Sequence, residues 1–244
     1  MYGGFASVYD LFMDDIPYDA WFGYVKEFLH KNGIFSGVVV ELACGTGEMA
    51  KRLCGAGYDV IGVDLSEEML AEARDKCGAD VLFLHQDIRG LDLYGSASAM
   101  VCVCDGMNYI CEEEGLRQVF GRAYTFLDEH GILIFDMKTE YFYREVLGDC
   151  TLADNREGAS YIWENVYHKD EKLNEYLLTV YELVDDKRDL FVRTDEIHRQ
   201  KAYDVEAVCG CLKEKGFEMV EVYEALTDKK PGPLSERVYF IARK

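Results

Sequence analysis

Most of the chain alternates between amphipathic segments and short apolar runs. In the amphipathic segments apolar side chains recur at helical spacing, which predicts helices that bury one face. The apolar runs are rich in Val and Ile and lack polar alternation, as is typical of strands buried on both faces. Helices are expected over residues 18–31, after Gly47, after Ser66 and over residues 116–127, and strands over residues 37–42, 59–64, 81–84, 99–104 and 131–136.

This order of elements predicts an α/β fold. Strands that alternate with helices at this spacing form a mostly parallel, Rossmann-like sheet that carries helices on both faces. The pattern resumes near the end of the chain, where Asp204 caps a further helix and residues 217–222 and 235–242 read as strands.

Between these two parts the pattern is different. After Asp136 a short helix is expected around residues 139–147, and long strand-like runs separated by polar turns follow it, which predicts an antiparallel β meander. The long runs cover residues 161–168, 173–184 and 190–200. We therefore expect a parent domain and an inserted β-rich lid or substrate subdomain. The parent domain would comprise residues 1–137 and 201–244, and the insertion residues 138–200.

The charge of the chain bears on its partners. Its 244 residues carry a formal net charge of -20 and contain no basic run. Because nucleic-acid binders draw much of their affinity from Lys and Arg placed against phosphates, we expect no nucleic-acid partner. The same charge disfavours adhesion to anionic membranes, and no apolar run approaches the roughly 18 residues of a membrane span.

The cysteines bear on the compartment. There are nine, and the two closely spaced pairs, Cys102 with Cys104 and Cys209 with Cys211, are C-x-C pairs with no His cluster beside them. This usage predicts reduced thiols and no metal site. Residues 1–5 also lack the basic region and apolar core of a signal peptide. We expect a cytoplasmic protein.

The strongest chemical signal is the segment Glu41-Leu-Ala43-Cys-Gly45-Thr-Gly47, which lies between a predicted strand and a predicted helix. Glycines at this place let the backbone pass close to a ligand at the carboxyl end of a sheet. With Ala50 the segment also satisfies G-x-G-x-x-A, the fingerprint of a nicotinamide or flavin site.

Three acidic residues bear on these two possibilities, of which Asp64 fits both. Glu41 disfavours a pyrophosphate nearby and suits a cationic ligand. Asp64 ends the second strand, where it can accept hydrogen bonds from both hydroxyls of a ribose. Asp87, next to the apolar Ile88, can bind an adenine amino group, which a NAD site does not specifically require.

Together these motifs resemble those of the class I S-adenosylmethionine-dependent methyltransferases. Residues 41–47 are similar to the first motif of that family, residues 60–66 to the second, Asp87 with Ile88 to the third and residues 101–105 to the fourth. Residues 5–14 resemble the start of many small bacterial members that act on small molecules. The resemblance implies a seven-stranded sheet whose last strand is antiparallel.

The resemblance also implies S-adenosylmethionine as cofactor and a set of residues that bind it. They would contact its methionine part, ribose and adenine, with Cys104 offering its backbone carbonyl and Tyr9 closing over the cofactor. The residues are Tyr9, Glu41, Ala43, Gly45, Gly47, Asp64, Leu65, Met69, Asp87, Ile88 and Cys104. Two alternatives stay open, since Tyr9 could belong to a packed amphipathic face and Asp87 could simply begin a loop.

Candidates for acceptor binding and catalysis come from two places. Asp105, Asn108 and Tyr109 follow the fourth strand, at the end where such folds place their chemistry. They could instead form a polar loop that caps the next helix. His198 shares one face of the last inserted strand with Glu196, by period two. We expect His198 to act as a base or acceptor ligand, or else to be a solvated strand histidine, and Asp105 is the other candidate base.

The resulting hypothesis is in-line transfer of a methyl group to a small-molecule acceptor, for which the protein supplies mainly alignment and exclusion of water. Two alternatives are a NAD-dependent oxidoreductase and a non-catalytic S-adenosylmethionine-binding module. A nucleic-acid methyltransferase is disfavoured by the charge and by the absence of an N/D-P-P-Y/F motif after the fourth strand. The sequence predicts neither the acceptor nor the oligomeric state.

Overall fold

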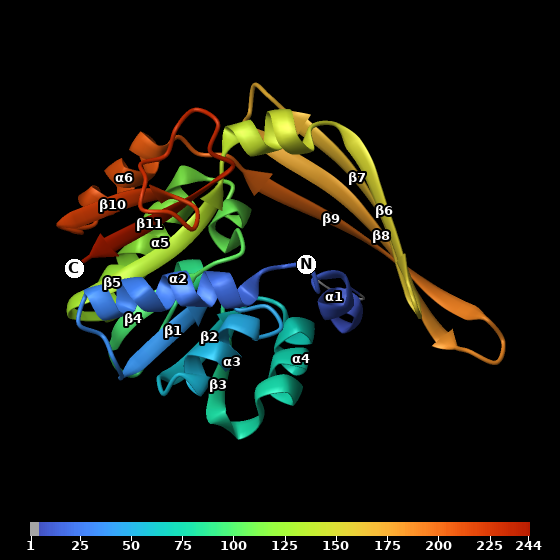
Figure 1. Cartoon of the computed structure of the whole chain (residues 1–244), viewed down its shortest axis with the longest axis horizontal. Helices are drawn as coiled ribbons and strands as arrows, with labels where there is room; N and C mark the ends of the chain where they lie inside the picture. Colours follow the sequence, from blue (N-terminus) through green and yellow to red (C-terminus); the bar gives the residue numbers. More distant parts are fainter. Residues whose placement is uncertain (1–4) are drawn as a thin grey trace.

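Seven strands form the larger of two sheets in the computed structural model, which describes residues 5–244 (Figure 1). The strand order is β10-β11-β5-β4-β1-β2-β3. Adjacent strands pair in parallel from β5 to β3, whereas β11 runs antiparallel to both of its neighbours. The strands are β1 (Val38–Leu42), β2 (Asp59–Asp64), β3 (Val81–His85), β4 (Ala97–Cys102), β5 (Leu127–Lys138), β10 (Met219–Glu224) and β11 (Arg237–Arg243). The predicted Rossmann-like sheet with an antiparallel last strand is confirmed.

Four further strands form a separate antiparallel sheet in the order β6-β7-β8-β9. They are β6 (Cys150–Arg156), β7 (Ala159–His168), β8 (Leu173–Asp185) and β9 (Leu190–Lys201), and a short π-helical turn, η4 (Phe142–Leu147), precedes them. The sequence predicted only three of these strands. It missed β6, a largely exposed strand without a strong apolar alternation, whose place is set by pairing with β7. Figure 1 shows this sheet reaching away from the parent domain, with the β8–β9 hairpin at its far end.

Asn108 connects the second sheet to the parent domain through hydrogen bonds. It is fully buried, and its side-chain amide donates to the backbone carbonyls of Lys138 (3.2 Å) and Lys201 (2.8 Å). Its side-chain oxygen accepts from the backbone N–H of Lys138 at 2.9 Å. Lys138 ends β5 and Lys201 ends β9, so one side chain joins the two ends of the expected insertion.

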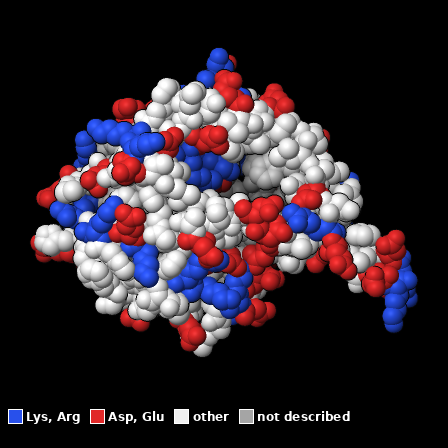
Figure 2. Space-filling view, viewed as in Figure 1, with Lys and Arg blue, Asp and Glu red and all other residues white. Residues whose placement is uncertain are grey.

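The helix α1 (Ala6–Phe12) and the residues after it connect the second sheet to the parent domain, where Asp10 pairs with Lys76 of α4 (Glu67–Cys77) at 2.6 Å. Phe12 packs edge-to-face on Tyr161 of β7 with ring centroids 4.9 Å apart, and Asp14 pairs with Arg156 of β6 at 3.0 Å. Figure 2 shows acidic side chains gathered around this helix, while Lys and Arg are interspersed with Asp and Glu elsewhere on the visible face. Residues 1–4 lie outside the described residues, and with them most of the segment that was compared with a signal peptide.

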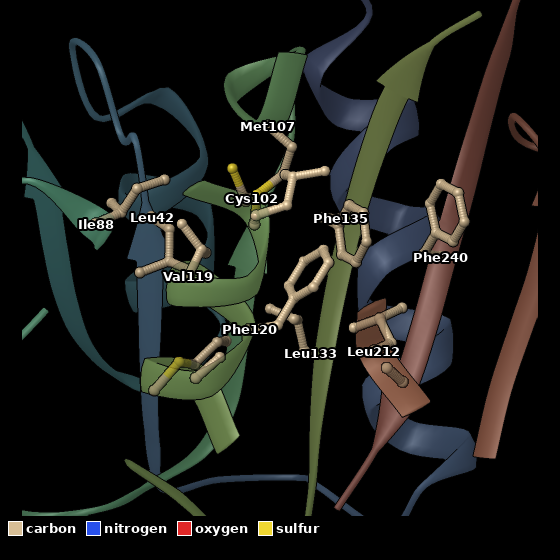
Figure 3. Close-up of a cluster of buried hydrophobic side chains, with 14 of the residues drawn as sticks. Leu42, Ile88, Cys102, Met107, Val119, Phe120, Leu133, Phe135, Leu212 and Phe240 are labelled. Carbon is tan, nitrogen blue, oxygen red and sulfur yellow. The ribbon is translucent and has the colours of Figure 1, made fainter. Parts of the chain in front are cut away.

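Helices cover both faces of the large sheet because alternate strand residues point to opposite sides. Val39 packs with α2 (Tyr18–Lys31), α3 (Glu48–Gly55) and α4 (Glu67–Cys77), whereas Val40 packs with α5 (Glu113–Phe126) and α6 (Val205–Glu214). Figure 3 shows the second of these cores, in which Phe135 and Phe240 stack with centroids 4.7 Å apart. In the part of the chain that the structure describes, no helix is both long and apolar enough to span a membrane.

Candidate functional site

The segments that follow β1, β2, β3 and β4 surround a cavity of about 280 Å³. This is the carboxyl edge of the parallel strands, where open α/β sheets bind their ligands. The second sheet and α1 each contribute to its wall. Most of the residues that the sequence singled out line this cavity: Tyr9, Glu41, Ala43, Gly45, Asp64, Leu65, Met69, Asp87, Ile88, Cys104, Tyr109 and His198.

Asp64 organises the loop that follows β1. Its Oδ2 accepts a hydrogen bond from the backbone N–H of Gly45 at 2.8 Å, and its Oδ1 accepts one from Ser66 at 2.9 Å. Burial raises the pKa of Asp64, although these backbone donors oppose the rise. Gly45 has a φ of +52°, and a Cβ atom there would point into open space rather than meet protein. The loop therefore presents bare backbone to the cavity.

Glu41 places a buried carboxyl group beside this loop. Only 4% of the residue is exposed, and Oε2 has no hydrogen-bond partner within residues 5–244. Burial raises the pKa of Glu41 well above its usual value. A buried carboxyl oxygen without a partner costs free energy unless a ligand supplies a donor or a positive charge. This site therefore fits a ligand that carries an ammonium or sulfonium group.

The opposite end of the cavity is suited to an adenine ring. Met69 and Ile88 are buried apolar residues of its wall, while Leu65 is half exposed. Asp87 accepts from the backbone N–H of Arg89 at 2.9 Å and pairs with its guanidinium group. The hydrogen bond from that side chain lowers the pKa of Asp87. Asp87 does begin a loop, and it also lines the cavity.

Gly47 is not part of the cavity wall. It caps α3 in the left-handed conformation, with a φ of +78°, and a Cβ atom there would lie 3.2 Å from Cβ of Ala73 and 3.4 Å from Sγ of Cys77. The structure thus uses Gly47 for close packing of α3 on α4, whereas Gly45 contacts the cavity.

Asp105 and Asn108 are also placed away from the cavity. Asp105 is buried in an ion cluster, where its carboxylate lies 2.8 Å from Lys138 Nζ and 2.5 Å from a guanidinium nitrogen of Arg237. Arg237 also pairs with the buried Asp136. Burial alone would raise the pKa of Asp105, but the two cations overcome this and hold it below its usual range. Asn108 is occupied by the backbone contacts described above.

His198 is buried rather than solvated, with 3% of the residue exposed. Its Nε2 lies 3.0 Å from Oε2 of Glu196, and its Nδ1 lies 3.4 Å from the hydroxyl of Tyr109. The ring stacks on Tyr176 with centroids 4.8 Å apart. The predicted sharing of one strand face by Glu196 and His198 is confirmed, and that face is turned toward the parent domain.

Several wall residues were not predicted. Thr46, Glu48, Ser66, Gln86 and Arg89 stand next to the motif residues, so their sequence position could have suggested them. Tyr18 and Ile110 come from α2 and from the loop after η3 (Gly106–Tyr109), and no signal in the sequence connects them to the site. The remaining ones are Cys44, Met49, Val103 and Gly106.

Known proteins resemble this chain in sequence and in fold. Residues 39–131 match a family model described as a methyltransferase domain. Over 100% of its length the chain is 37% identical to a protein of Geobacillus sp. (strain WCH70) that is named as a methyltransferase, and it covers 99% of that protein.

Two crystal structures share the whole architecture. An S-adenosylmethionine-dependent methyltransferase from Clostridium acetobutylicum superposes with a TM-score of 0.86 and 28% identity, over 98% of this chain and 97% of that one. The sugar N-methyltransferase KedS8 from Streptoalloteichus sp. superposes with a TM-score of 0.80 and 20% identity, over 97% of this chain and 92% of that one. The likeness extends through both sheets.

Proposed function

We propose, since this chain belongs to the class I S-adenosylmethionine-dependent methyltransferases, that it methylates a small-molecule acceptor held between the two sheets. The observation that carries the proposal is a single cavity. Its wall combines the residues of the cofactor motifs with Tyr109 and with His198 of the second sheet. Membership in this family argues against the alternative function of a NAD-dependent oxidoreductase.

The wall residues fit S-adenosylmethionine. The unpartnered Oε2 of Glu41 would face its cationic portion, and the open backbone at Gly45 would lie against its methionine part. Asp64 would hold the ribose, and Asp87 with Ile88 the adenine. The bound cofactor supplies an electrophilic methyl group on a positively charged sulfur. The task of the protein is then to align the acceptor and to exclude water.

Three features support a small acceptor. The cavity wall includes Tyr9 of α1 and His198 of the second sheet, so an acceptor would be held between these elements and the parent domain, which favours a small molecule. The net charge of -20 disfavours nucleic acid. KedS8, which has the same two-sheet architecture, is a sugar methyltransferase by name. We further propose that residues 138–200 form the acceptor-binding subdomain.

The cysteines support action in a reducing compartment. None of the nine forms a disulfide in the structure, and Cys44, Cys102 and Cys211 are buried. Because cytosolic proteins keep their thiols reduced, we propose that the protein works in the cytoplasm.

The test is transfer of a labelled methyl group. The protein is incubated with methyl-labelled S-adenosylmethionine and, separately, with a low-molecular-mass bacterial metabolite extract, with RNA and DNA, and with a protein extract. Label that appears only in the low-molecular-mass products supports the proposal. Label in nucleic acid or protein contradicts it, and cofactor binding without transfer to any fraction would indicate a non-catalytic module.

A further inference from the structure

A row of buried and half-buried rings and polar groups leads from the second sheet to the cavity wall. Trp163, Tyr176 and His198 stack in series, with centroid distances of 3.9 Å and 4.8 Å and interplanar angles of 17° and 10°. The hydroxyl of Tyr109 lies 2.7 Å from that of Tyr176. Tyr109 and His198 reach the cavity. The stack fixes the plane of the imidazole ring.

Glu196 lies against one of the two ring nitrogens of His198. Its Oε1 accepts a hydrogen bond from the backbone N–H of Phe5 at 3.3 Å, and its Oε2 lies 3.0 Å from Nε2 of His198. A carboxylate accepts hydrogen bonds, so this contact favours the tautomer in which Nε2 is the donor and Nδ1 keeps its lone pair. Nδ1 faces the hydroxyl of Tyr109 at 3.4 Å and can accept its proton.

We propose that Tyr109, His198 and Glu196 form a proton relay, so that the acceptor is an alcohol, phenol or amine whose oxygen or nitrogen gives up a proton. This inference rests on the proposed function. Tyr109 is the catalytic residue that touches the acceptor, and His198 and Glu196 act through it. The order of carboxylate, imidazole and hydroxyl is that of a hydrolase triad, here used to remove a proton rather than to form a covalent intermediate.

The step is balanced in atoms and electrons. The lone pair of the acceptor forms the new bond to the methyl carbon and displaces the carbon–sulfur electron pair onto sulfur. The acceptor proton passes to the oxygen of Tyr109, while the proton of Tyr109 passes to Nδ1 of His198. The imidazolium that results faces the carboxylate of Glu196, and it returns its proton to solvent after the product leaves.

The first test is spectroscopic and needs no acceptor. The chain has five histidines, so ring-nitrogen-labelled histidine gives five sets of signals, and His198→Gln identifies those of His198. The relay requires the Nε2–H tautomer with a hydrogen-bonded, unprotonated Nδ1. Glu196→Gln should weaken this tautomer preference, while Tyr109→Phe should shift only the Nδ1 signal. An Nδ1–H tautomer in the native protein would overturn the relay.

The second test is kinetic, with the labelled cofactor and the low-molecular-mass extract. Tyr109→Phe should lower kcat about 100-fold, as expected for loss of a proton-transfer group, with the KM for S-adenosylmethionine unchanged. Tyr143→Phe is the matched control, because it removes a buried hydroxyl that bonds Gln200 (3.1 Å) away from the cavity. This control should keep kcat. Equal kcat in Tyr109→Phe and native protein overturns the relay.

The product provides the third test. A methyl group on an oxygen or nitrogen that carried hydrogen supports the relay, and a methylated thioether or tertiary amine overturns it. If the native protein labels no small molecule, the proposed function fails, and the tautomer measurement still decides whether the relay exists.

Discussion

Asp64 and Gly45 are joined by a hydrogen bond of 2.8 Å from the backbone N–H of Gly45 to Oδ2 of Asp64. The bond connects the end of β2 to the loop after β1, which are 19 residues apart. A second backbone donor, from Ser66, holds the other carboxylate oxygen at 2.9 Å. Asp64 therefore shapes the loop that carries Gly45, and it also reaches the cavity itself.

The two glycines of this loop should respond differently to alanine. Both have left-handed backbone, so each substitution should cost about 1–2 kcal/mol of stability. Gly45→Ala adds a methyl group to the cavity side and should weaken S-adenosylmethionine binding. Gly47→Ala adds crowding against Ala73 and Cys77 and should lower the melting temperature further. Calorimetric binding and thermal unfolding of both variants check this, and equal loss of affinity in the two would contradict it.

Glu41 should make cofactor binding depend on pH. Its pKa is raised by burial, and a cationic ligand beside it would lower that pKa by favouring the carboxylate. At pH values between the pKa of Glu41 in the complex and its pKa in the free protein, binding should therefore release a proton. In that pH range, which lies above the usual carboxylate range, the affinity for S-adenosylmethionine should rise with pH. Titrations in buffers of different ionisation enthalpy measure the released proton. The isosteric Glu41→Gln should bind without proton release, and S-adenosylhomocysteine, which lacks the sulfonium charge, should release less.

Lys76 should control the position of α1. Its Nζ lies 2.6 Å from Asp10 of α1 and 2.6 Å from Glu48, and it donates to Thr46 at 3.1 Å. Lys76→Met removes the ammonium group that connects Asp10 of α1 to Glu48 and to Thr46 in the loop after β1. The dissociation constant for S-adenosylmethionine should rise about tenfold, or about 1.4 kcal/mol. Amide hydrogen exchange in α1 should accelerate. The exposed Lys213 provides the control, because Lys213→Met should change neither quantity.

Arg237 should be essential for stability. It pairs with Asp105 and Asp136, both buried, and its guanidinium lies over Trp21 at 5.1 Å. Removal of one partner from a buried ion pair costs about 3–5 kcal/mol, so Arg237→Met should lower the free energy of unfolding by that order. Denaturant unfolding of the variant checks the magnitude.

The pH dependence of stability tests the same cluster. The folded pKa of Asp105 is held below its unfolded value, so its contribution is present above about pH 4 and is lost as the pH falls through the folded pKa. In Arg237→Met, Asp105 keeps Lys138 as a partner, whereas the buried Asp136 loses its cation, so burial should raise the pKa of Asp136 further. That variant should gain stability between neutral pH and about pH 4, because protonation removes the buried charge. A parallel decline of both proteins toward acid pH would contradict this account.

The sequence predicted the large sheet well because most of its strands contain a distinct apolar run, although β10 (Met219–Glu224) begins two residues later than expected. Residues 59–64 and the helix at residues 18–31 match β2 and α2. The strand β6 has no such signal, since most of its residues are exposed and its pairing with β7 defines it. Cys104 was expected in a strand but follows β4, with a φ of +67°.

The sequence predicted which residues lie together at the cavity where local chain order sets their position. Asp64 ends β2 and Ile88 follows β3, and the ends of these strands meet at one edge of the sheet, so both residues reach the cavity. Asp105 and Asn108 also follow a strand, but distant partners engage their side chains, namely Arg237 and the backbone of Lys138 and Lys201. Contacts with residues so distant in the chain form only in the folded protein, so no periodic pattern in the sequence predicts them.

The most direct test of the account is a calorimetric titration of the native protein and of Asp64→Ala with S-adenosylmethionine, S-adenosylhomocysteine and NAD. The account predicts micromolar binding of the first two ligands to the native protein, with no binding of NAD. It predicts loss of that binding in Asp64→Ala, which removes the acceptor for the Gly45 N–H and the carboxylate that we propose holds the ribose. Binding of NAD alone, or equal affinity for S-adenosylmethionine in both proteins, would contradict the assignment of this cavity as the cofactor site.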